Sequence, residues 1–267
     1  MTHMPNTNHM SNTNYMPNTT NQIQVFARPK SLKDVPFRYC PGCHHGIIHR
    51  LIAEAIDFFD IREKTIGVAP VGCAVFAHEY FNIDMIEVAH GRPPAAVTGM
   101  KRARPENIIF SYQGDGDLAS IGMAETIHAA NRGENVSFIF VNNAIYGMTG
   151  GQMAPTTLTG QVTKTTPRGR DTKTDGFPLR ICELLATLDG TAYIERVAVN
   201  NPVNIKKARH AIRRAFQTQI ENLGFSLVEV LSACPTNWKM TPLEANQWID
   251  DSMIKTFPLG IYKERSR

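Results

Sequence analysis

Residues 108–143 read IIFSYQGDGDLASIGMAETIHAANRGENVSFIFVNN, and this stretch decides the fold. Two apolar runs, 108–112 and 136–141, stand near its ends, and each has the length of a buried strand. Between them lie a loop of glycine and aspartate, 113–117, and a segment with helical apolar spacing from about Leu118 to Asn131. A strand, a helix and a second strand in this order predict a βαβ crossover, which belongs to a parallel sheet with helices on its faces.

The rest of the chain continues this alternation. Helical spacing of apolar residues predicts further helices, and short apolar runs that end in glycine-containing loops predict further strands. We therefore expect an α/β protein with a parallel sheet flanked by helices. The expected helices cover 47–59, 93–104, 178–188 and 203–222, and the expected strands cover 65–69, 85–89, 192–199 and 225–231.

Three regions are expected along the chain. Residues 1–23 contain a six-residue repeat (HMPNTN, HMSNTN, YMPNTT) with almost no aliphatic side chains, which predicts a disordered tail. Residues 24–240 carry the patterned elements and form the expected globular domain. Within it, 149–177 is a long loop rich in Gly, Thr and Pro, and loops of this length are usually functional. Residues 241–267 are predicted to be an extension that wraps around the domain.

The composition excludes several classes of protein. With 267 residues, 42% of them hydrophobic and 19% charged, the chain can bury an ordinary core. A net charge of +4 is too small to indicate a nucleic-acid partner without a concentrated basic face. No apolar run approaches the roughly 18–20 residues of a membrane span, and the start lacks the residue order of a signal peptide. These features predict a cytoplasmic protein with no membrane partner.

The central βαβ unit carries residues suited to a diphosphate and Mg²⁺. Asp115 follows the first strand and Asn143 follows the second, and neighbouring parallel strands would bring both to one crevice. Gly114 and Gly116 let the backbone approach phosphate oxygens. Asp115, Asn143 and a backbone carbonyl could supply the hard oxygen ligands that Mg²⁺ prefers. The alternative is an ordinary strand-to-helix turn capped by Asp117.

Five cysteines in a chain without an export signal predict metal or redox use rather than disulfides. Cys40 and Cys43 form a Cys-Pro-Gly-Cys loop, and Cys73 and Cys234 lie in two further turns. A thioredoxin-like pair would not need the last two, so a tetrahedral sulfur site is favoured, which suits either zinc or an iron–sulfur cluster. Cys182 lies in an apolar helical stretch and is interpreted as a small buried hydrophobe.

A resemblance joins these two sites. GDG, then twenty-five residues, then Asn-Asn resembles the thiamine-diphosphate fingerprint, which implies that Asp115, Asn143 and the carbonyl of Ile145 hold Mg²⁺. The chain resembles the beta subunits of 2-oxoacid:ferredoxin oxidoreductases, in particular those of the 2-ketoisovalerate type, which implies a thiamine-diphosphate-binding (PP-type) domain. The shared motifs are CPGC at 40–43, VGC at 71–73, HGR at 90–92, GDGD at 114–117, NNAIYGMTGGQ at 142–152 and ACPT at 233–236.

The resemblance also implies the remaining ligands. One [4Fe–4S] cluster would be ligated by Cys40, Cys43, Cys73 and Cys234. His90 would hydrogen-bond the cofactor or an intermediate as the catalytic residue, although a histidine at a strand end is as often structural. The thiamine diphosphate would be contacted by Val71, Gly72, Cys73, Ala74, His90, Gly116, Asp117, Gly147 and Met148.

Two positions depart from the family pattern. His44 stands where the family usually has glycine after the second cysteine, and we expect it to strain a turn. Gly72-Cys73-Ala74-Val75 stands where many members have Gly-Cys-Ser-Ser, and we expect this change to alter substrate choice.

The activity that the resemblance implies is oxidative decarboxylation of a 2-oxoacid to an acyl-CoA and CO₂, with coenzyme A as co-substrate and electrons passed to ferredoxin. The apolar run Ala74-Val75-Phe76-Ala77 favours a branched substrate such as 2-oxoisovalerate. The chain has length for only one half-site, and Glu87 and Glu125 are interpreted as structural. A partner alpha-type subunit would therefore supply the pyrimidine half-site and its activating glutamate, and a ferredoxin-like subunit or ferredoxin would take the electrons.

Two rivals remain open. One is the subunit of a non-oxidative thiamine-dependent 2-oxoacid decarboxylase, and the other is a metal-stabilised binding subunit without catalysis. The predicted helix 203–222 carries a group of basic side chains that is either a solvated face or a docking surface for an acidic ferredoxin. These side chains are Lys206, Lys207, Arg209, Arg213 and Arg214.

Overall fold

The computed structural model describes residues 26–265, and the repeat predicted for residues 1–23 lies outside them. A single sheet of seven strands runs through the described part, in the order β2-β1-β3-β4-β6-β5-β7. Its strands are β1 (Thr65–Pro70), β2 (Asp84–Val88), β3 (Ile108–Gly114), β4 (Ser137–Asn142), β5 (Thr191–Ala198), β6 (Phe225–Leu231) and β7 (Gly260–Glu264).

Every neighbouring pair is parallel except β5 and β7. The predicted α/β class and the six predicted strands are confirmed, with boundaries shifted by one or two residues. Because β2 and β3 flank β1 on opposite sides, the chain direction across the sheet reverses there. In open α/β sheets such a reversal leaves a crevice at the carboxyl ends of the strands, where ligands bind.

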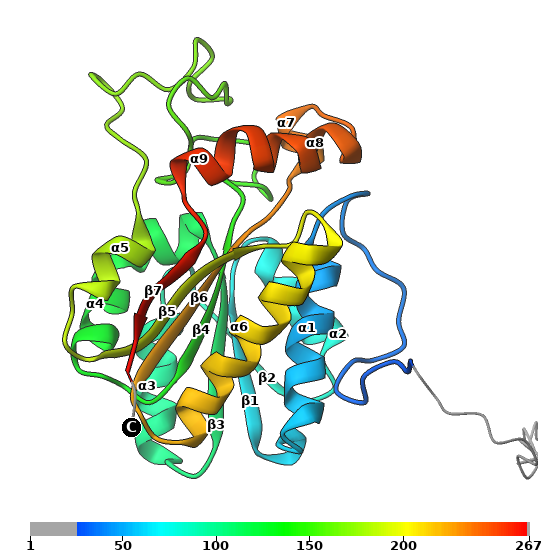
Figure 1. Cartoon of the computed structure of the whole chain (residues 1–267), viewed down its shortest axis with the longest axis vertical. Helices are drawn as coiled ribbons and strands as arrows, with labels where there is room; N and C mark the ends of the chain where they lie inside the picture. The colour runs from blue at the N-terminus through cyan, green and yellow to red at the C-terminus, as the bar shows by residue number, and fades with distance from the viewer. Residues whose placement is uncertain (1–25, 266–267) are drawn as a thin grey trace, which may run out of the picture.

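Helices cover both faces of the sheet (Figure 1). The core on one face joins α1 (His45–Phe58) and α6 (Pro202–Ile220) to the strands, and the short helix α2 (Ala77–Tyr80) also contributes to it. The core on the other face joins α3 (Pro93–Ala103), α4 (Met123–Asn131) and α5 (Ile181–Ala186) to the strands. Burial of apolar side chains on both faces explains why the central strands read as continuous apolar runs.

The helix predicted from Leu118 is divided. Asp117–Ile121 form a π-helical turn, and α4 begins only after Gly122. The cause is the close approach of the loop at Gly91, since a Cβ on Gly122 would lie 2.7 Å from the Gly91 carbonyl oxygen. Two glycines are thus needed for these backbones to touch, and turns of this π type are common at functional sites.

The chain after β6 forms more than the predicted wrapping extension of residues 241–267. It builds α7 (Pro235–Trp238), α8 (Pro242–Trp248), a π-helical turn (Ile249–Met253), α9 (Ile254–Thr256) and the edge strand β7. Ile249, Met253 and Phe257 are fully buried and pack with Leu231 and Ala198 at the ends of β6 and β5. This segment therefore caps the edge of the sheet at which the strands end (Figure 1).

A charged pair is buried between β5 and β6. The side chains of Arg196 on β5 and Glu229 on β6 are both fully buried, and Arg196 Nε donates to Glu229 Oε2 over 2.8 Å. Arg196 also pairs with Glu183, 2.6 Å away. Cys182 donates its thiol hydrogen to Glu229 Oε2 over 3.1 Å, so its interpretation as a simple hydrophobe was incomplete. Sequence periodicity marks such positions only as buried, because it carries no information about cross-strand partners.

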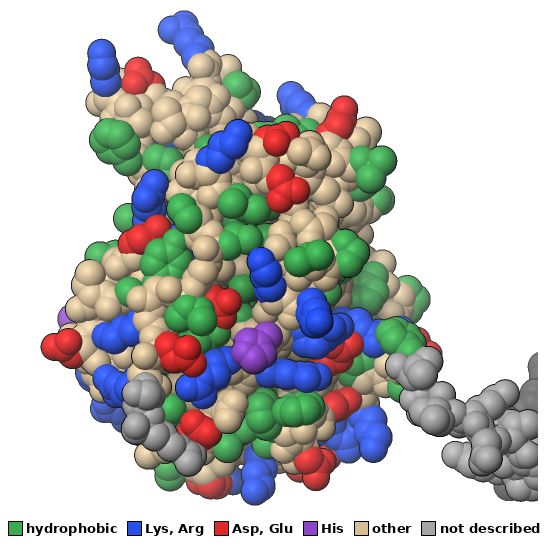
Figure 2. Space-filling model, in the orientation of Figure 1, with side chains coloured by type: hydrophobic (Ala, Val, Ile, Leu, Met, Phe, Trp, Pro, Cys, Tyr) green, Lys and Arg blue, Asp and Glu red, His purple; other side chains and the backbone are tan. Residues whose placement is uncertain are grey.

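The basic side chains of α6 are partly neutralised. Figure 2 shows Lys and Arg side chains gathered over this helix, with acidic side chains among them. Arg209 pairs with Glu54 at 2.8 Å and Arg214 with Glu264 at 2.7 Å. The Arg213 guanidinium stacks over the Phe58 ring, 4.1 Å from its centroid.

Of the helices within residues 26–265, none combines the length and apolarity needed to cross a bilayer.

We predict that Arg196→Met lowers the free energy of unfolding by about 3–5 kcal/mol, because it leaves the Glu229 carboxylate buried without its charged partner. Urea unfolding followed by circular dichroism measures this. The control is Arg104→Met, which breaks an exposed pair with Glu106 and should cost at most about 1 kcal/mol. Equal effects of the two substitutions would contradict the assignment.

Candidate active site

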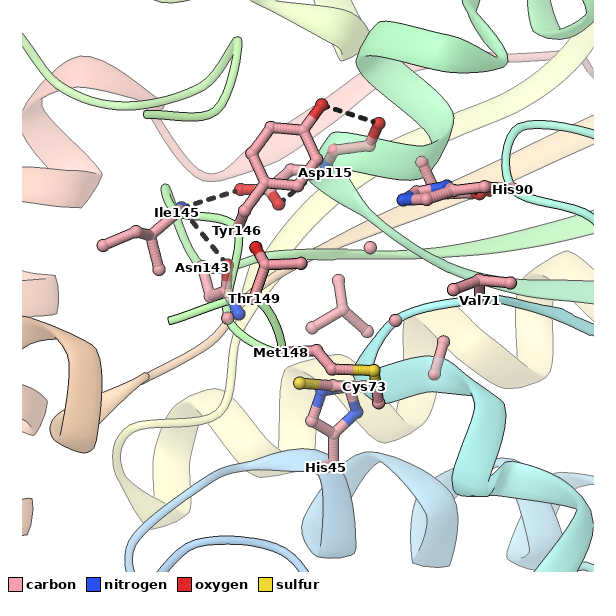
Figure 3. A pocket seen from close by; sticks show the side chains of 17 residues that line it. His45, Val71, Cys73, His90, Asp115, Asn143, Ile145, Tyr146, Met148 and Thr149 are labelled. Atoms are coloured by element: carbon pink, nitrogen blue, oxygen red, sulfur yellow. Dashed lines mark hydrogen bonds and ion pairs between the residues drawn. The ribbon is translucent and has the colours of Figure 1, made fainter. Parts of the chain in front are cut away.

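One pocket lies at the crevice predicted by the strand order (Figure 3). It is lined by segments that follow β1, β2, β3 and β4. Every residue predicted to contact a diphosphate, its metal or the attached cofactor lines it: Val71, Gly72, Cys73, Ala74, His90, Gly114, Asp115, Gly116, Asp117, Asn143, Ile145, Gly147 and Met148. The other lining residues are His45, Val141, Tyr146 and Thr149.

Asp115 and Asn143 face the same backbone group. The N–H of Ile145 lies 3.2 Å from Asp115 Oδ2 and 3.3 Å from Asn143 Oδ1. Asp115 Oδ1 accepts from the Gly116 N–H at 2.8 Å, and its Oδ2 also accepts from Thr156 Oγ1 at 2.6 Å. Burial raises the pKa of Asp115 to about 6, although these hydrogen bonds act against the rise. A buried carboxylate beside an amide oxygen is a donor set that fits Mg²⁺.

The long loop 149–177, which was expected to be functional, supports this arrangement through hydrogen bonds. Besides the Thr156 bond, Thr157 Oγ1 donates to the Ala144 carbonyl at 2.7 Å and Gln161 Nε2 donates to the same oxygen at 3.2 Å. Ala144 has φ +57°, a left-handed conformation that costs an alanine energy. The hydrogen bonds from Thr157 and Gln161 therefore hold the turn after β4 in a conformation that its own sequence does not favour.

The two glycines of the GDG turn have different surroundings. A Cβ on Gly116 would lie 2.0 Å from the Tyr146 ring, whose hydroxyl donates to the Gly116 carbonyl at 3.2 Å. A Cβ on Gly114 would meet nothing within 4 Å. Gly116 is thus required by protein packing, whereas the space beside Gly114 remains open to a ligand.

Asp117 uses its carboxylate within the protein. Oδ1 lies 2.5 Å from His90 Nδ1 and accepts from the Gly91 N–H at 2.5 Å, while Oδ2 accepts from Gln113 Nε2 at 2.6 Å. Burial raises the pKa of Asp117, and these partners oppose the rise. The carboxylate therefore fixes the His90 loop against the GDGD turn and leaves His90 Nε2 as the ring nitrogen available to a ligand.

His45 is a lining residue that sequence reasoning missed. Its Nδ1 lies 2.5 Å from the Tyr112 hydroxyl, and its ring stacks on Tyr39 with centroids 4.6 Å apart. Burial lowers the pKa of His45 to about 3, so the ring is neutral at pH 7. Its position two residues after Cys43 was the available signal. The missed Tyr146 and Thr149 stand inside the quoted motif of residues 142–152, but no spacing rule assigns them to the pocket.

The cysteines predicted as ligands gather beside the pocket. A Cβ on Gly147 would lie 3.3 Å from Cys73 Sγ and 3.7 Å from Cys234 Sγ, so both sulfurs approach this one residue. Burial is the main cause that raises the pKa of Cys43 to about 12, and Cys234, Cys73 and Cys40 contribute to the same rise. Burial raises the pKa of Cys73 to about 11, with Cys234 and Cys40 acting in the same direction.

These thiols make one another harder to ionise. As thiolates they would therefore suit a bound group that supplies compensating positive charge. Within residues 26–265, no three His, Cys, Asp or Glu side chains lie close enough together to share a single metal ion. A [4Fe–4S] cluster makes a different demand, because each of its irons takes one thiolate.

His44 does not strain its turn, so that expectation was wrong. It has φ −83° and ψ −2°, a conformation open to any residue, and it directly precedes α1. Its Nδ1 accepts from the Ala233 N–H at 3.1 Å and its Nε2 lies 2.9 Å from Asn246 Oδ1. His44 therefore links the loop of Cys43 to the segment of Cys234.

The pocket lies where the chain direction across the mostly parallel sheet reverses, and it is lined by glycines and buried carboxylates. This is the arrangement of a diphosphate-binding enzyme domain. Residues 70–230 match the family described as thiamine pyrophosphate enzyme, C-terminal TPP binding domain. A ketoisovalerate oxidoreductase subunit VorA from Methanothermobacter thermautotrophicus is 50% identical in an alignment of 253 positions that covers 91% of this chain and 53% of that protein. A 2-oxoglutarate synthase subunit KorB from Archaeoglobus fulgidus is 37% identical over 86% of this chain and 85% of that protein.

The chain therefore belongs to the thiamine pyrophosphate enzymes and, within them, to the family of 2-oxoacid oxidoreductase subunits. It spans about half the length of the ketoisovalerate oxidoreductase subunits that it matches. Its fold is that of the 2-oxoglutarate:ferredoxin oxidoreductase from Magnetococcus marinus, with a TM-score of 0.77 at 23% identity over 92% of this chain and 88% of that one.

We predict opposite outcomes for alanine at the two glycines of the GDG turn. Gly116→Ala should lower the free energy of unfolding by about 1–3 kcal/mol, because its methyl group overlaps the Tyr146 ring. Gly114→Ala should keep the stability but weaken binding of thiamine pyrophosphate, because its methyl group occupies the open space. Urea unfolding measures the stability. Calorimetric titration with thiamine pyrophosphate in the presence of Mg²⁺ measures the binding. Gly99→Ala, on an exposed helix position with open space, is the control for binding.

Proposed function

We propose that this chain is the thiamine-pyrophosphate-binding and [4Fe–4S]-carrying subunit of a 2-oxoacid:ferredoxin oxidoreductase. The observation that carries this proposal is the position of Gly147. It lines the cofactor pocket, and a Cβ on it would lie 3.3 Å from Cys73 Sγ and 3.7 Å from Cys234 Sγ, so the proposed redox centre shares a wall with the pocket. A non-oxidative decarboxylase has no need for four thiols at this place, and a purely structural metal site has no need to adjoin the pocket.

Asp115, Asn143 and the Ile145 carbonyl would hold Mg²⁺, and the backbone at Gly114 and Gly116 would receive the diphosphate. When bound, the thiazolium ring supplies an electron sink for decarboxylation of the 2-oxoacid. The chain's own contribution is orientation, through the Asp115 and Asp117 hydrogen bonds, and a cysteine wall, Cys40, Cys43, Cys73 and Cys234, that would hold the cluster next to the reacting atoms. Coenzyme A would accept the acyl group, and ferredoxin would accept the two electrons one at a time.

A partner must complete this site. Among the lining residues the only carboxylates are Asp115 and Asp117, and both are engaged by hydrogen bonds within the protein. Glu125 is paired with Arg92, and Glu87 lies on the edge strand β2. An alpha-type partner would therefore supply the pyrimidine half-site with its activating glutamate. We place the assembly in the cytoplasm, where free cysteines such as these stay reduced.

The substrate is proposed to be a branched 2-oxoacid such as 2-oxoisovalerate. Val71, Ala74 and Met148 give the pocket an apolar wall. None of its lining residues, all within the described part of the chain, is Lys or Arg, which a second carboxylate such as that of 2-oxoglutarate would require. The 50% identity to ketoisovalerate oxidoreductase subunits supports the same choice.

We predict that anaerobic purification yields a brown protein with about four irons per chain and broad absorption near 400 nm. Asp115→Ala should lose thiamine pyrophosphate binding but keep the iron, because the two sites use separate ligands. Cys182→Ala should keep the full colour, since this thiol bonds to Glu229 and not to the cysteine wall. Stoichiometric zinc without iron would overturn the cluster assignment, and bleaching in Cys182→Ala would overturn the ligand set.

We predict, for the chain produced together with its partner subunits, reduction of a viologen dye that depends on coenzyme A. Across a panel of 2-oxoacids, kcat/KM should be highest for 2-oxoisovalerate and at least about tenfold lower for 2-oxoglutarate, whose second carboxylate would be buried without a cation. A release of CO₂ that requires neither dye nor coenzyme A would instead support the non-oxidative decarboxylase.

A further inference from the structure

The short helix α7 lies between the cysteine wall and the turn that follows β4. Asn237, in this helix, donates from Nδ2 to Cys234 Sγ at 3.2 Å and to the Gly147 carbonyl oxygen at 2.9 Å. One amide group thus bonds both to a proposed cluster ligand and to the wall of the cofactor pocket. Among the described residues, Cys234 is the one proposed cluster ligand whose sulfur accepts a side-chain hydrogen bond.

The orientation of this amide follows from its partners. A carbonyl oxygen and a thiolate sulfur are both acceptors, so the nitrogen of the Asn237 amide must face them. Gly151 packs against the other side, where a Cβ on that glycine would lie 3.2 Å from Asn237 Oδ1. The amide N–H of Asn237 therefore points at this particular sulfur, where a donor favours negative charge.

We propose that Asn237 is a positioning residue that raises the reduction potential of the cluster through its hydrogen bond to Cys234. The higher potential makes the cluster a better acceptor for the electrons released in the adjoining pocket. The inference rests on the proposed function and deepens it. When the cluster takes up one electron, its negative charge grows by one. A donor at a ligand sulfur stabilises the more negative state, and hydrogen bonds to sulfur are among the factors that set cluster potentials.

The test is a redox titration of the anaerobically purified full chain with dithionite, followed by electron paramagnetic resonance. Asn237→Leu removes the side-chain donor at similar volume without adding a charge. We expect iron content and fold to be retained and the equilibrium constant for one-electron reduction to fall about tenfold, which is about 59 mV for a one-electron couple. Asn237→Ala is measured in parallel in case leucine is not accommodated.

Trp238→Phe provides the matched control. The indole Nε1 of this neighbouring residue donates to the Asn143 carbonyl oxygen at 3.1 Å and has no hydrogen bond to the Cys234 sulfur. Its loss should weaken the turn that holds Mg²⁺ and leave the cluster potential at its wild-type value. An equal shift in Trp238→Phe and Asn237→Leu would show a general effect of disturbing α7 and would overturn the proposal.

The remaining outcomes separate this inference from the function on which it rests. A wild-type potential in both Asn237 variants, with the cluster present, overturns the role of Asn237 and leaves the proposed function intact. Loss of iron from both Asn237 variants, with iron retained in Trp238→Phe, shows that Asn237 holds the ligand in place without tuning it, which also overturns the proposal. A wild-type chain that carries no iron–sulfur cluster removes the proposed function and this inference together.

Discussion

A buried carboxylate, that of Asp115, accepts hydrogen bonds from its own turn and from residues 30 and 41 positions further along the chain. The Gly116 N–H belongs to the turn after β3, the Ile145 N–H to the turn after β4, and Thr156 to the long loop. A charge with so little solvent persists only where such donors or a cation compensate it. The pocket, the proposed metal site and the path of the long loop all depend on this compensation.

The turn after β4 connects this carboxylate to the cysteines. Within a few residues it presents Asn143 towards Asp115 and Gly147 towards Cys73 and Cys234. A Cβ at Gly147 would lie 3.3 Å from Cys73 Sγ and 3.7 Å from Cys234 Sγ, so this residue borders both sulfurs. One turn therefore determines the separation of the proposed cofactor and the proposed cluster, and α7 bonds to it from the opposite side through Asn237 and Trp238.

The turn after β4 is also connected by hydrogen bonds to the buried charged pair of Glu229 and Arg196. Glu229 accepts from Asn142 Nδ2 at 2.7 Å, and Asn142 Oδ1 in turn accepts from the Ala144 N–H at 3.1 Å. Arg196 neutralises Glu229 and bonds to the Pro258 carbonyl before β7. These hydrogen bonds connect the C-terminal segment to Ala144, the residue at the site that has a strained backbone. The buried ion pair therefore helps to position the site, in addition to its modest net contribution to stability.

Local patterns in the sequence determined the element types and indicated the ligand chemistry that we propose. Apolar periodicity predicted the six parallel strands and the helices that cover them, because both depend on the spacing of neighbouring residues. The GDG turn, the paired asparagines and the CPGC loop identified residue types suited to Mg²⁺, a diphosphate and a sulfur-bound metal. All of these could be inferred without coordinates.

Only the tertiary structure decided which of these residues meet. The contact between Gly91 and Gly122 that divides the predicted helix, and the engagement of Asp117 by His90 and Gln113, arise between segments that no local pattern relates. The same holds for the C-terminal strand β7, whose short polar sequence becomes a strand because β5 offers it an unpaired edge. Hydrogen bonds and close packing act across space, so their partners become defined only when the chain has closed into one sheet.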